Sequence, residues 1–295
     1  MSRISIITPF YRGNSYMKPL AGCLYGAVDR LHEVYPGVKV EWLVVNDSPG
    51  CAVDAAECWL QPEVIDLPEN GGIHHARLEG LKKAQGDYIL FLDQDDRIGR
   101  AFFVRQLETL KKNPGSGMSV CNAFLEQEDG TLMPMYTRRG DMEQIRHLDV
   151  YLKVCDPIRS PGQCLIRREA IPDAWGRHVI RENGSDDLFL WILMLVAGVQ
   201  IETIPECLYT HSWSGANVSG SSEQIRSSSM NVVRALSLAG VLSNRQLSAL
   251  RHSVEWGART SAENRKYYLK NPEISSVRMY WKIRRALSRP LQPQA

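Results

Sequence analysis

Asp93, Asp95 and Asp96 stand close together in the chain, directly after the apolar run 88–92. Carboxylates packed so closely repel one another unless a cation, a helix N-terminus or solvent neutralises them. Mg²⁺ and Mn²⁺ prefer carboxylate oxygens and keep coordination positions open for phosphate oxygens. The cluster is therefore a candidate site for a metal that stabilises a diphosphate leaving group. The alternative is a solvated turn in which one aspartate caps the helix expected near 99–112.

A second candidate is the segment 70–77, in which Asn70, Gly71 and Gly72 precede a helical pattern that carries Arg77. Glycines let a backbone approach a ligand closely, and a helix N-terminus attracts anions. Arg77 is placed to meet a phosphate or a base. Taken alone, the segment is better explained as a glycine turn that caps a surface helix. No GxGxxG motif follows the first strand, which argues against a dinucleotide-binding Rossmann domain.

Two further acids, Asp186 and Asp187, precede the most apolar stretch of the chain. An acid at the start of a helix can be a cap, and a partly desolvated one can be a general base. Asp186 suits the cap and Asp187 the base, although capping alone would explain both. Farther on, His211 is by itself more often structural than a ligand. Trp213 is a candidate platform for a sugar ring, or a lid over the core.

The elements that must position these residues alternate between strands and helices. Short apolar runs at 4–8, 38–45, 64–67 and 88–92 are separated by helical patterns at 16–35 and 74–85. This alternation predicts an α/β fold with a mostly parallel central sheet, buried on both faces. Ligands of such sheets bind beyond the carboxyl ends of the strands. The polar clusters 8–11, 46–47 and 93–96 follow three of these strands, so we expect them to converge on one edge.

The rest of the chain predicts further elements in a less regular order. We expect a hairpin from 117–126 and 131–136, a helical piece at 141–153, and strands at 163–167 and 200–204, with a buried helix at 187–198 between them. From 221 onward the pattern is helical, with breaks at Ser243, near Ser261 and at Pro272. The predicted organisation is a catalytic domain at 1–219, with a nucleotide-binding half at 1–98 and an acceptor half at 99–219. A helical C-terminal extension follows at 220–295.

Composition narrows the class of protein. An apolar content of 44% and a charged content of 23% over 295 residues are ordinary for a soluble globular protein. The seven cysteines form no CxxC pair, so we expect reduced thiols in a cytosol. The N-terminal apolar run is too short for a signal peptide, and no apolar segment reaches the ~20 residues of a membrane span. We therefore expect a cytoplasmic protein.

The tail from 276 to 295 is basic and holds no acid. Its apolar residues recur at helical spacing, and its basic residues are Arg278, Lys282, Arg284, Arg285 and Arg289. A basic amphipathic helix at 276–289 suits the anionic headgroup layer at the inner face of a membrane. The alternative is that the apolar stripe packs on the chain's own domain. Elsewhere no basic stripe is interleaved with aromatic residues, so we expect no nucleic-acid partner.

Several segments, in order, resemble glycosyltransferase family 2, an inverting family with the GT-A fold. They are SIITPFYRG at 5–13, VVND at 44–47, NGGIHHARLEG at 70–80, DYILFLDQDD at 87–96 and SDDLFLWILMLVAG at 185–198. The third matches the family's NxGxxxARNxG with Leu78 in place of the usual Asn. The fourth holds the family's DxD metal signature. Each motif alone is weak, but their order and spacing are specific, and the resemblance covers Arg3 to Ser219.

The resemblance implies a role for each matching residue. The donor nucleotide sugar would be bound by Thr8, Pro9, Phe10, Tyr11, Asp47, Asn70, Gly72, Arg77, Asp93 and Gln94, with Asp47 at the nucleobase. A Mn²⁺ or Mg²⁺ ion would be held by Asp93 and Asp95, with His211 as a further ligand. Asp187 would be the general base. Asp186, where the family usually has Glu, would contact the acceptor. Trp213 is a candidate acceptor contact from its residue type alone.

The implied function is metal-dependent transfer of a hexose-type sugar from a nucleotide diphosphate donor, with UDP-sugars favoured. The acceptor would be a hydroxyl of a glycan or lipid-linked oligosaccharide, as in bacterial polysaccharide or glycolipid synthesis. A nucleotidyltransferase that makes nucleotide sugars is an alternative, but the segment 10–14 lacks the glycine- and lysine-rich loop it needs. A non-catalytic glycan-binding module is another, although it should have lost the DxD motif or the late acid. The sequence leaves the sugar, the acceptor and the oligomeric state open.

Overall fold

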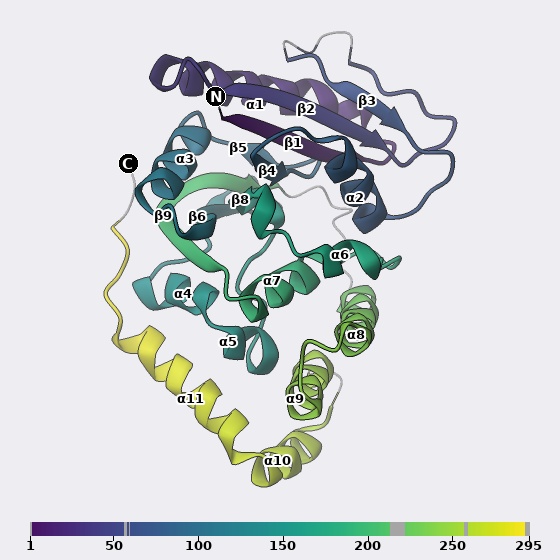
Figure 1. Cartoon of the computed structure of the whole chain (residues 1–295). Coiled ribbons are helices and arrows are strands. Elements are labelled where there is room, and N and C mark those ends of the chain that lie inside the picture. The colour runs from purple at the N-terminus through teal and green to yellow at the C-terminus, as the bar shows by residue number, and fades with distance from the viewer. Residues whose placement is uncertain (1, 56–57, 59, 213–221, 257–258, 293–295) are drawn as a thin grey trace.

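The N-terminal part of the protein is a parallel sheet (Figure 1). The structure is a computed structural model that describes residues 2–55, 58, 60–212, 222–256 and 259–292. The parallel strands are β1 (Arg3–Phe10), β2 (Lys39–Asn46), β3 (Glu63–Asp66) and β4 (Tyr88–Phe91). Strand β1 lies between β2 and β4, and β3 lies outside β2. All four strands occupy the predicted places, so the clusters that follow β1, β2 and β4 meet at one edge.

Helices cover both faces of this sheet because its strands are apolar on both sides. Ile6 of β1 packs in one core cluster with α1 (Asn14–Val34) and α3 (Phe102–Lys112). Its neighbour Ile7 faces the other cluster, which includes α2 (Ile73–Lys83). A Cβ added to Gly80 of α2 would lie 2.4 Å from Cγ2 of Ile7 and 3.0 Å from Cγ2 of Val45. Glycine at this position therefore lets α2 approach the sheet closely.

Beyond β4 the same sheet becomes mixed. It continues through β8 (Cys164–Arg167), β6 (Ser116–Glu126), β9 (Gln200–His211) and β5 (Arg97–Ile98), with β7 (Leu132–Pro134) beside β6. Strand β8 is antiparallel to β4 and β6, whereas β6 and β9 are parallel. The antiparallel pairing of β6 and β7 confirms the predicted hairpin. Strand β9 is longer than predicted because a bulge accommodates Pro205 and Glu206, after which pairing with β6 resumes.

The helices between residues 139 and 196 lie across the mixed strands from β1, β2 and β3 (Figure 1). The helical piece predicted at 141–153 is divided into α4 (Arg139–Glu143) and α5 (Leu148–Lys153), with a 3₁₀ turn between them. Helix α6 (Asp173–Arg177) precedes α7 (Asp186–Val196). Helix α7 is buried from Leu188 to Met194, as its apolar sequence predicts.

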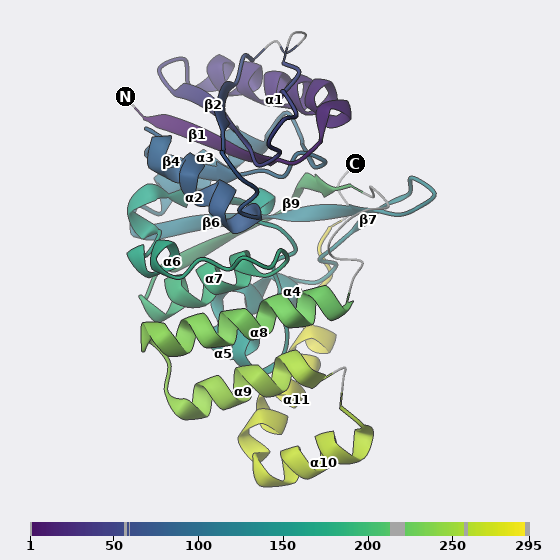
Figure 2. The same ribbon diagram turned by 90° about the vertical axis from the view of Figure 1, so that its right-hand side faces the viewer.

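The C-terminal helices are α8 (Ser222–Ala239), α9 (Asn244–Glu255), α10 (Ser261–Lys270) and α11 (Pro272–Leu287). Capping boxes at Ser243 and Thr260 start α9 and α10, and Pro272 starts α11, so all three predicted breaks are confirmed. Figures 1 and 2 show α8 and α9 stacked below α7, and α11 returning past α5 and α4. The predicted domain boundary at 219/220 falls among residues outside the described part of the chain.

Helix α11 packs on its own domain, which was the alternative considered for the basic tail. Trp281 is buried, and its ring centroid lies 4.8 Å from that of His147. Arg278 donates to the backbone oxygen of Lys153 at 2.6 Å, and Arg284 donates to Glu143 at 2.8 Å. These arginines therefore fasten the helix to the domain. An apolar strip remains exposed on α11, made of Met279, Tyr280, Ile283 and Leu287.

Candidate active site

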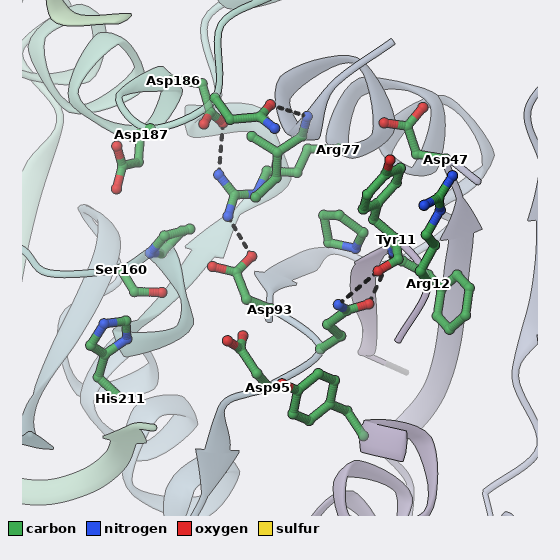
Figure 3. A pocket seen from close by; sticks show the side chains of 18 of the residues that line it. Tyr11, Arg12, Asp47, Arg77, Asp93, Asp95, Ser160, Asp186, Asp187 and His211 are labelled. Atoms are coloured by element: carbon green, nitrogen blue, oxygen red, sulfur yellow. Dashed lines mark hydrogen bonds and ion pairs between the residues drawn. The ribbon is translucent and has the colours of Figure 1, made fainter. Parts of the chain in front are cut away.

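A pocket of about 590 Å³ lies where the carboxyl ends of β1, β2 and β4 meet the start of α7. Residues from both predicted halves line it (Figure 3). Of the predicted site residues, the lining includes Pro9, Phe10, Tyr11, Asp47, Asn70, Arg77, Asp93, Gln94, Asp95, Asp186, Asp187 and His211. The predicted convergence of the three polar clusters is therefore confirmed.

Arg77 connects the two sides of this pocket. Its Nη2 donates to Oδ1 of Asp93 at 2.6 Å, and its Nη1 donates to Oδ2 of Asp186 at 2.7 Å. The side chain of Arg77 is only 3% exposed, so its charge depends on these two carboxylates for compensation. Burial opposes its charged form, but Asp186 and Asp93 outweigh that effect and raise the pKa of Arg77. The guanidinium is thus a fixed positive charge at the centre of the site.

Asp47 holds the glycine segment at the start of α2. Its carboxylate accepts hydrogen bonds from the N–H groups of Gly71 at 2.7 Å and Gly72 at 2.9 Å. Gly72 has a φ of 84°, and an added Cβ would lie 2.9 Å from the carbonyl oxygen of Arg181. Only glycine fits that position without strain. Asp47 lines the pocket, and its predicted contact with the nucleobase stays a prediction.

Tyr11 and Gln94 both line the pocket, and the backbone of Tyr11 is hydrogen-bonded to the side chain of Gln94. The N–H of Tyr11 donates to Oε1 of Gln94 at 3.0 Å, and Nε2 of Gln94 donates to the Tyr11 carbonyl at 3.2 Å. The ring of Tyr11 is half exposed, with the guanidinium of Arg12 5.4 Å from its centroid. An aromatic surface next to a cation suits a nucleobase and its phosphates.

The three clustered aspartates have different surroundings. Asp96 is buried and accepts from the hydroxyl of Tyr209 and from the N–H of Ser212 at 3.0 Å, so it fastens the end of β9. Asp95 faces the pocket, where burial raises its pKa to about 6, with a further contribution from the charges of Asp96 and Asp93. Burial likewise raises the pKa of Asp93, against the opposing effect of Arg77. A bound cation would relieve this crowding.

Few side chains of the pocket are placed to act as metal ligands. Within the described residues, no three His, Cys, Asp or Glu side chains are arranged to hold a metal ion. The predicted ligand His211 points its Nδ1 toward Oδ1 of Asp96 at 3.3 Å, and this contact raises its pKa although burial opposes it. Asp93 and Asp95 remain as pocket-facing carboxylates. One or two carboxylates plus substrate phosphates is the usual way in which Mg²⁺ is bound, so these residues fit such an ion.

Asp187 lies on the other side of the pocket from Asp93 and Asp95 (Figure 3). Its Oδ1 accepts a hydrogen bond from the N–H of Leu188 at 2.8 Å. Burial raises the pKa of Asp187 well above its ordinary value, and the negative charges of Asp156 and Asp186 add to this effect. A carboxylate that binds a proton this readily has the property required of a general base.

Helix α8 of the C-terminal extension and Trp175 of α6 hold the loop that leads into α7. Oγ of Ser228 in α8 donates to the carbonyl oxygen of Glu182 at 2.7 Å. The hydroxyls of Ser185 and Ser229 lie 2.8 Å apart, and Nε1 of Trp175 donates to the carbonyl of Asp186 at 3.0 Å. Helix α8 therefore helps to fix the position of Asp187, a role that the sequence did not reveal for the C-terminal extension.

For some predicted site residues the structure shows another place or another contact than the predicted one. Thr8 is fully buried and does not line the pocket, and its Oγ1 accepts from Nε1 of Trp42 at 3.0 Å, which leaves its predicted contact with the donor without support. Gly72 does not line the pocket, and its N–H donates one hydrogen bond to Asp47. The carboxylate of Asp186 is turned to Arg77, which leaves its predicted contact with the acceptor without support. Trp213 lies outside the described residues.

Other residues that line the pocket were not among the predicted site residues. Arg159 and Ser160 reach the pocket from the irregular polar stretch before β8. Asn183 also lines it, and its Oδ1 accepts from the N–H of Ile73 at 2.8 Å, which joins the loop before α7 to the start of α2. Arg12 has a positive φ of 49°, and its N–H donates to Oγ of Ser48 at 2.8 Å. Of these residues, only Arg12 lies in a segment that the motifs singled out, SIITPFYRG at 5–13.

Comparison with known proteins decides the family. A family model described as Glycosyl transferase family 2 matches residues 5–175, more than half of the chain. The chain belongs to glycosyltransferase family 2. This agrees with the resemblance read from the motifs.

Relatives of this family 2 chain include bacterial enzymes. TuaG of Bacillus subtilis (strain 168), named as a teichuronic acid biosynthesis glycosyltransferase, is 30% identical over 138 residues, which cover 43% of this chain and 49% of TuaG. An N-acetylglucosaminyltransferase of Rhizobium sp. (strain N33) is 24% identical over 229 residues, 70% of this chain and 47% of the relative. The chain thus spans about half the length of these relatives.

Solved structures establish the fold of the family 2 chain. TarS 1–349 of S. aureus, in complex with UDP-GlcNAc, superposes with a TM-score of 0.60 at 17% identity and covers 86% of this chain and 72% of that one. The mannosyltransferase PcManGT of Pyrobaculum calidifontis, in complex with GDP-Man and Mn²⁺, has a TM-score of 0.56 at 15% identity, with coverages of 97% and 86%. These neighbours are GT-A glycosyltransferases, and the predicted GT-A fold is confirmed.

Proposed function

We propose that this glycosyltransferase inverts the anomeric centre as it moves a sugar from a nucleotide diphosphate donor to a hydroxyl. The observation that carries the proposal is the pair of contacts made by Arg77. Its guanidinium binds Asp93 of the DxD motif and also Asp186, the neighbour of Asp187. A donor bound at Asp93 would therefore present its sugar on the side of the pocket where Asp187 lies.

The donor that we favour is a UDP-sugar. Phe10, Tyr11 and Arg12 line one wall of the pocket and offer aromatic surface and a positive charge for a base and its phosphates. Among the structural neighbours, TarS is in complex with UDP-GlcNAc, whereas PcManGT is in complex with GDP-Man. The wall suits either base, so the donor has to be found by assay.

Asp93 and Asp95 would hold a divalent cation, Mn²⁺ or Mg²⁺, together with oxygens of the donor diphosphate. When bound, such a cation supplies positive charge that stabilises a departing diphosphate. Arg77 adds its own fixed charge next to Asp93. Whether His211 completes the metal site stays a prediction, because its Nδ1 is engaged with Asp96.

Asp187 would take the proton from the acceptor hydroxyl. As this proton moves to the carboxylate, the hydroxyl oxygen forms a bond to C1 of the sugar, and the bond from C1 to the diphosphate oxygen breaks. The diphosphate leaves with the electron pair, and one displacement inverts the configuration at C1. A positioned general base typically contributes a factor of about 10²–10⁴ in rate.

The acceptor that we propose is a glycan or a lipid-linked oligosaccharide, in line with relatives named for teichuronic and teichoic acid synthesis. We propose a cytoplasmic enzyme that contacts the membrane surface through the exposed apolar strip of α11, defined above. Within the described part of the chain, no helix has the length and apolar character to cross a membrane. Contact through α11 would bring the enzyme to a lipid-linked acceptor.

A donor screen tests the proposal. The full chain is incubated with UDP-glucose, UDP-galactose, UDP-GlcNAc or GDP-mannose, with Mn²⁺ or with EDTA, and free nucleoside diphosphate is measured. We expect release from one donor class with Mn²⁺ and little with EDTA. Release of pyrophosphate from a nucleoside triphosphate and a sugar phosphate would indicate a nucleotidyltransferase instead. Donor binding with no turnover, with or without bacterial glycolipid, would indicate a non-catalytic module.

A further inference from the structure

A second pocket, of about 840 Å³, lies among the C-terminal helices, between α10, the end of α9 and the start of α11. It shares no lining residue with the pocket at Asp187. Figures 1 and 2 place α10 at the opposite end of the molecule from β1, β2 and β3. Whatever this pocket binds is therefore bound away from the site of reaction.

One wall of the pocket is aromatic and held in place from behind. The rings of Trp256 and Tyr268 have centroids 5.1 Å apart. The guanidinium of Arg278 lies 4.6 Å from the Trp256 centroid, and Arg278 is itself fastened to the carbonyl of Lys153 at 2.6 Å. Trp256 remains 36% exposed. A fixed aromatic surface that is partly open packs well on the C–H face of a sugar ring and loses little entropy on binding.

The same wall holds polar atoms that have no hydrogen-bond partner in the described part of the chain. Asn264 is 7% exposed, and its Nδ2 donates to the carbonyl of Trp256 at 3.2 Å, whereas its Oδ1 has no hydrogen-bond partner among the described residues. The hydroxyl of Tyr268 and Nε of Arg259 are also unpaired within this part of the chain. Because buried polar atoms are nearly always paired, this concentration points to a ligand rich in hydrogen-bonding groups.

The lining is also positively charged. It includes Arg259 and Arg265 and no acidic side chain among the residues described. Arg259 is paired with Glu255, whereas Arg265 is exposed and has no ion pair with another described residue. Three serines and Asn264 complete the polar lining. Charge complementarity therefore favours a ligand that carries negative groups.

We propose that this pocket, lined by Trp256, Asn264, Arg265 and Tyr268, is a second glycan-binding site that takes a segment of an acidic oligosaccharide. The sugar or polyol units pack on the aromatic wall, their hydroxyls pair with the buried polar atoms, and their carboxylates or phosphates face Arg265. The proposal does not depend on the donor or on the reaction assigned to Asp187.

Calorimetric titration of the full chain tests the site. The probe is tetragalacturonic acid, a short chain of uronic acids, and maltotetraose is the neutral probe of equal length. We expect the acidic probe to bind at least ten-fold more tightly than the neutral one. Arg265→Glu should weaken its binding at least ten-fold. The matched control is Lys266→Glu, which makes the same charge change one residue away, outside the lining, and should alter binding less than two-fold.

Several results would overturn the proposal. If Arg265→Glu and Lys266→Glu weaken binding of the acidic probe equally, the attraction is a diffuse effect of a basic helix. If both probes bind with equal affinity, the ligand of this pocket is not selected for negative charge. Absence of binding by the parent chain would remove the site altogether. Binding to vesicles with anionic lipid that falls with Arg265→Glu, while the oligosaccharide does not bind, would assign the pocket to lipid headgroups.

Ser276→Trp, which fills the pocket, should abolish binding while the melting temperature is retained.

Discussion

Nη1 of Arg77 lies 2.7 Å from Oδ2 of Asp186, and both side chains are almost fully buried although 109 residues separate them in the chain. This ion pair joins the helix that follows the glycine segment to the start of the most apolar helix. The same guanidinium also binds Asp93. One side chain therefore sets the relative position of the donor motif and of Asp187.

Arg77→Lys should destabilise the protein strongly. A lysine ammonium is a compact charge and cannot hold two carboxylates in the forked geometry of a guanidinium. One buried acid is then left uncompensated, which costs about 3–5 kcal/mol. Urea denaturation measures the change. The control is Arg100→Lys. Arg100 forms an exposed ion pair with Asp29 at 3.3 Å, so this change should alter the free energy of unfolding by less than about 1 kcal/mol. Similar small effects of both changes would contradict the account of the bridge.

Gly80→Ala should destabilise the protein by roughly 1–3 kcal/mol, because the new Cβ would meet Ile7 at 2.4 Å in a packed core. Helix α2 would have to move away from β1, and Arg77 would move with it. The matched control is Gly22→Ala in α1, where nothing lies within 4 Å of the added Cβ. That change should stabilise by about 0.5–1 kcal/mol through helix propensity. Thermal unfolding compares the two, and equal stabilisation would disprove the close packing.

Asp95→Asn should make the metal-free protein more stable at alkaline pH. Burial, then Asp96 and Asp93, raise the pKa of Asp95 from 3.8 to about 6, so ionisation opposes folding. This destabilisation is absent below pH 3.8, grows as the pH rises and is complete above about 6. In EDTA at pH 8 the variant should gain about 1–3 kcal/mol, and at pH 4 much less. A gain that does not change with pH would contradict the crowding of the three aspartates.

The exposed strip of α11 should bind membranes. We expect the full chain to float with vesicles that contain anionic lipid, and the double variant Ile283→Glu, Leu287→Glu to lose most of this binding. Both residues are at least half exposed, so the fold should be retained. Leu238→Glu, at an exposed position of α8, is the control and should float like the parent. Equal recovery of the double variant would exclude this strip as a membrane contact.

The convergence of the polar clusters on one edge of the sheet could be predicted because the end of each strand is marked by residues close to it in the chain. The apolar runs ending at Thr8, Val45 and Leu92 are legible in the chain, and parallel pairing then brings the next residues together. The same pattern cannot tell which of those residues face the ligand. Thr8 lies near the end of strand β1, and its side chain is hydrogen-bonded to Trp42 of the adjacent strand, a contact that depends on strand register and side-chain volume.

Long-range contacts explain most of what the sequence did not reveal. The bond between Asp47 and the glycine segment spans 24 residues, and the bonds from α8 to the loop before α7 span more than 40. No local periodicity encodes such distances. Strand β9 was predicted too short for a different reason, because a proline and a glutamate interrupt its apolar pattern and only pairing with β6 shows that it continues.

The central claim is that Asp187 is the general base of a displacement at the pocket formed by Asp93, Asp95 and Arg77. Asp187→Asn tests it most directly, because the amide keeps the shape of the side chain but cannot accept the proton. With the donor found in the screen, transfer to acceptor is measured by turnover, and UDP affinity by calorimetry with Mn²⁺. We expect turnover to fall by a factor of about 10²–10⁴ while UDP affinity changes less than two-fold. Turnover equal to that of the parent enzyme would contradict the assignment.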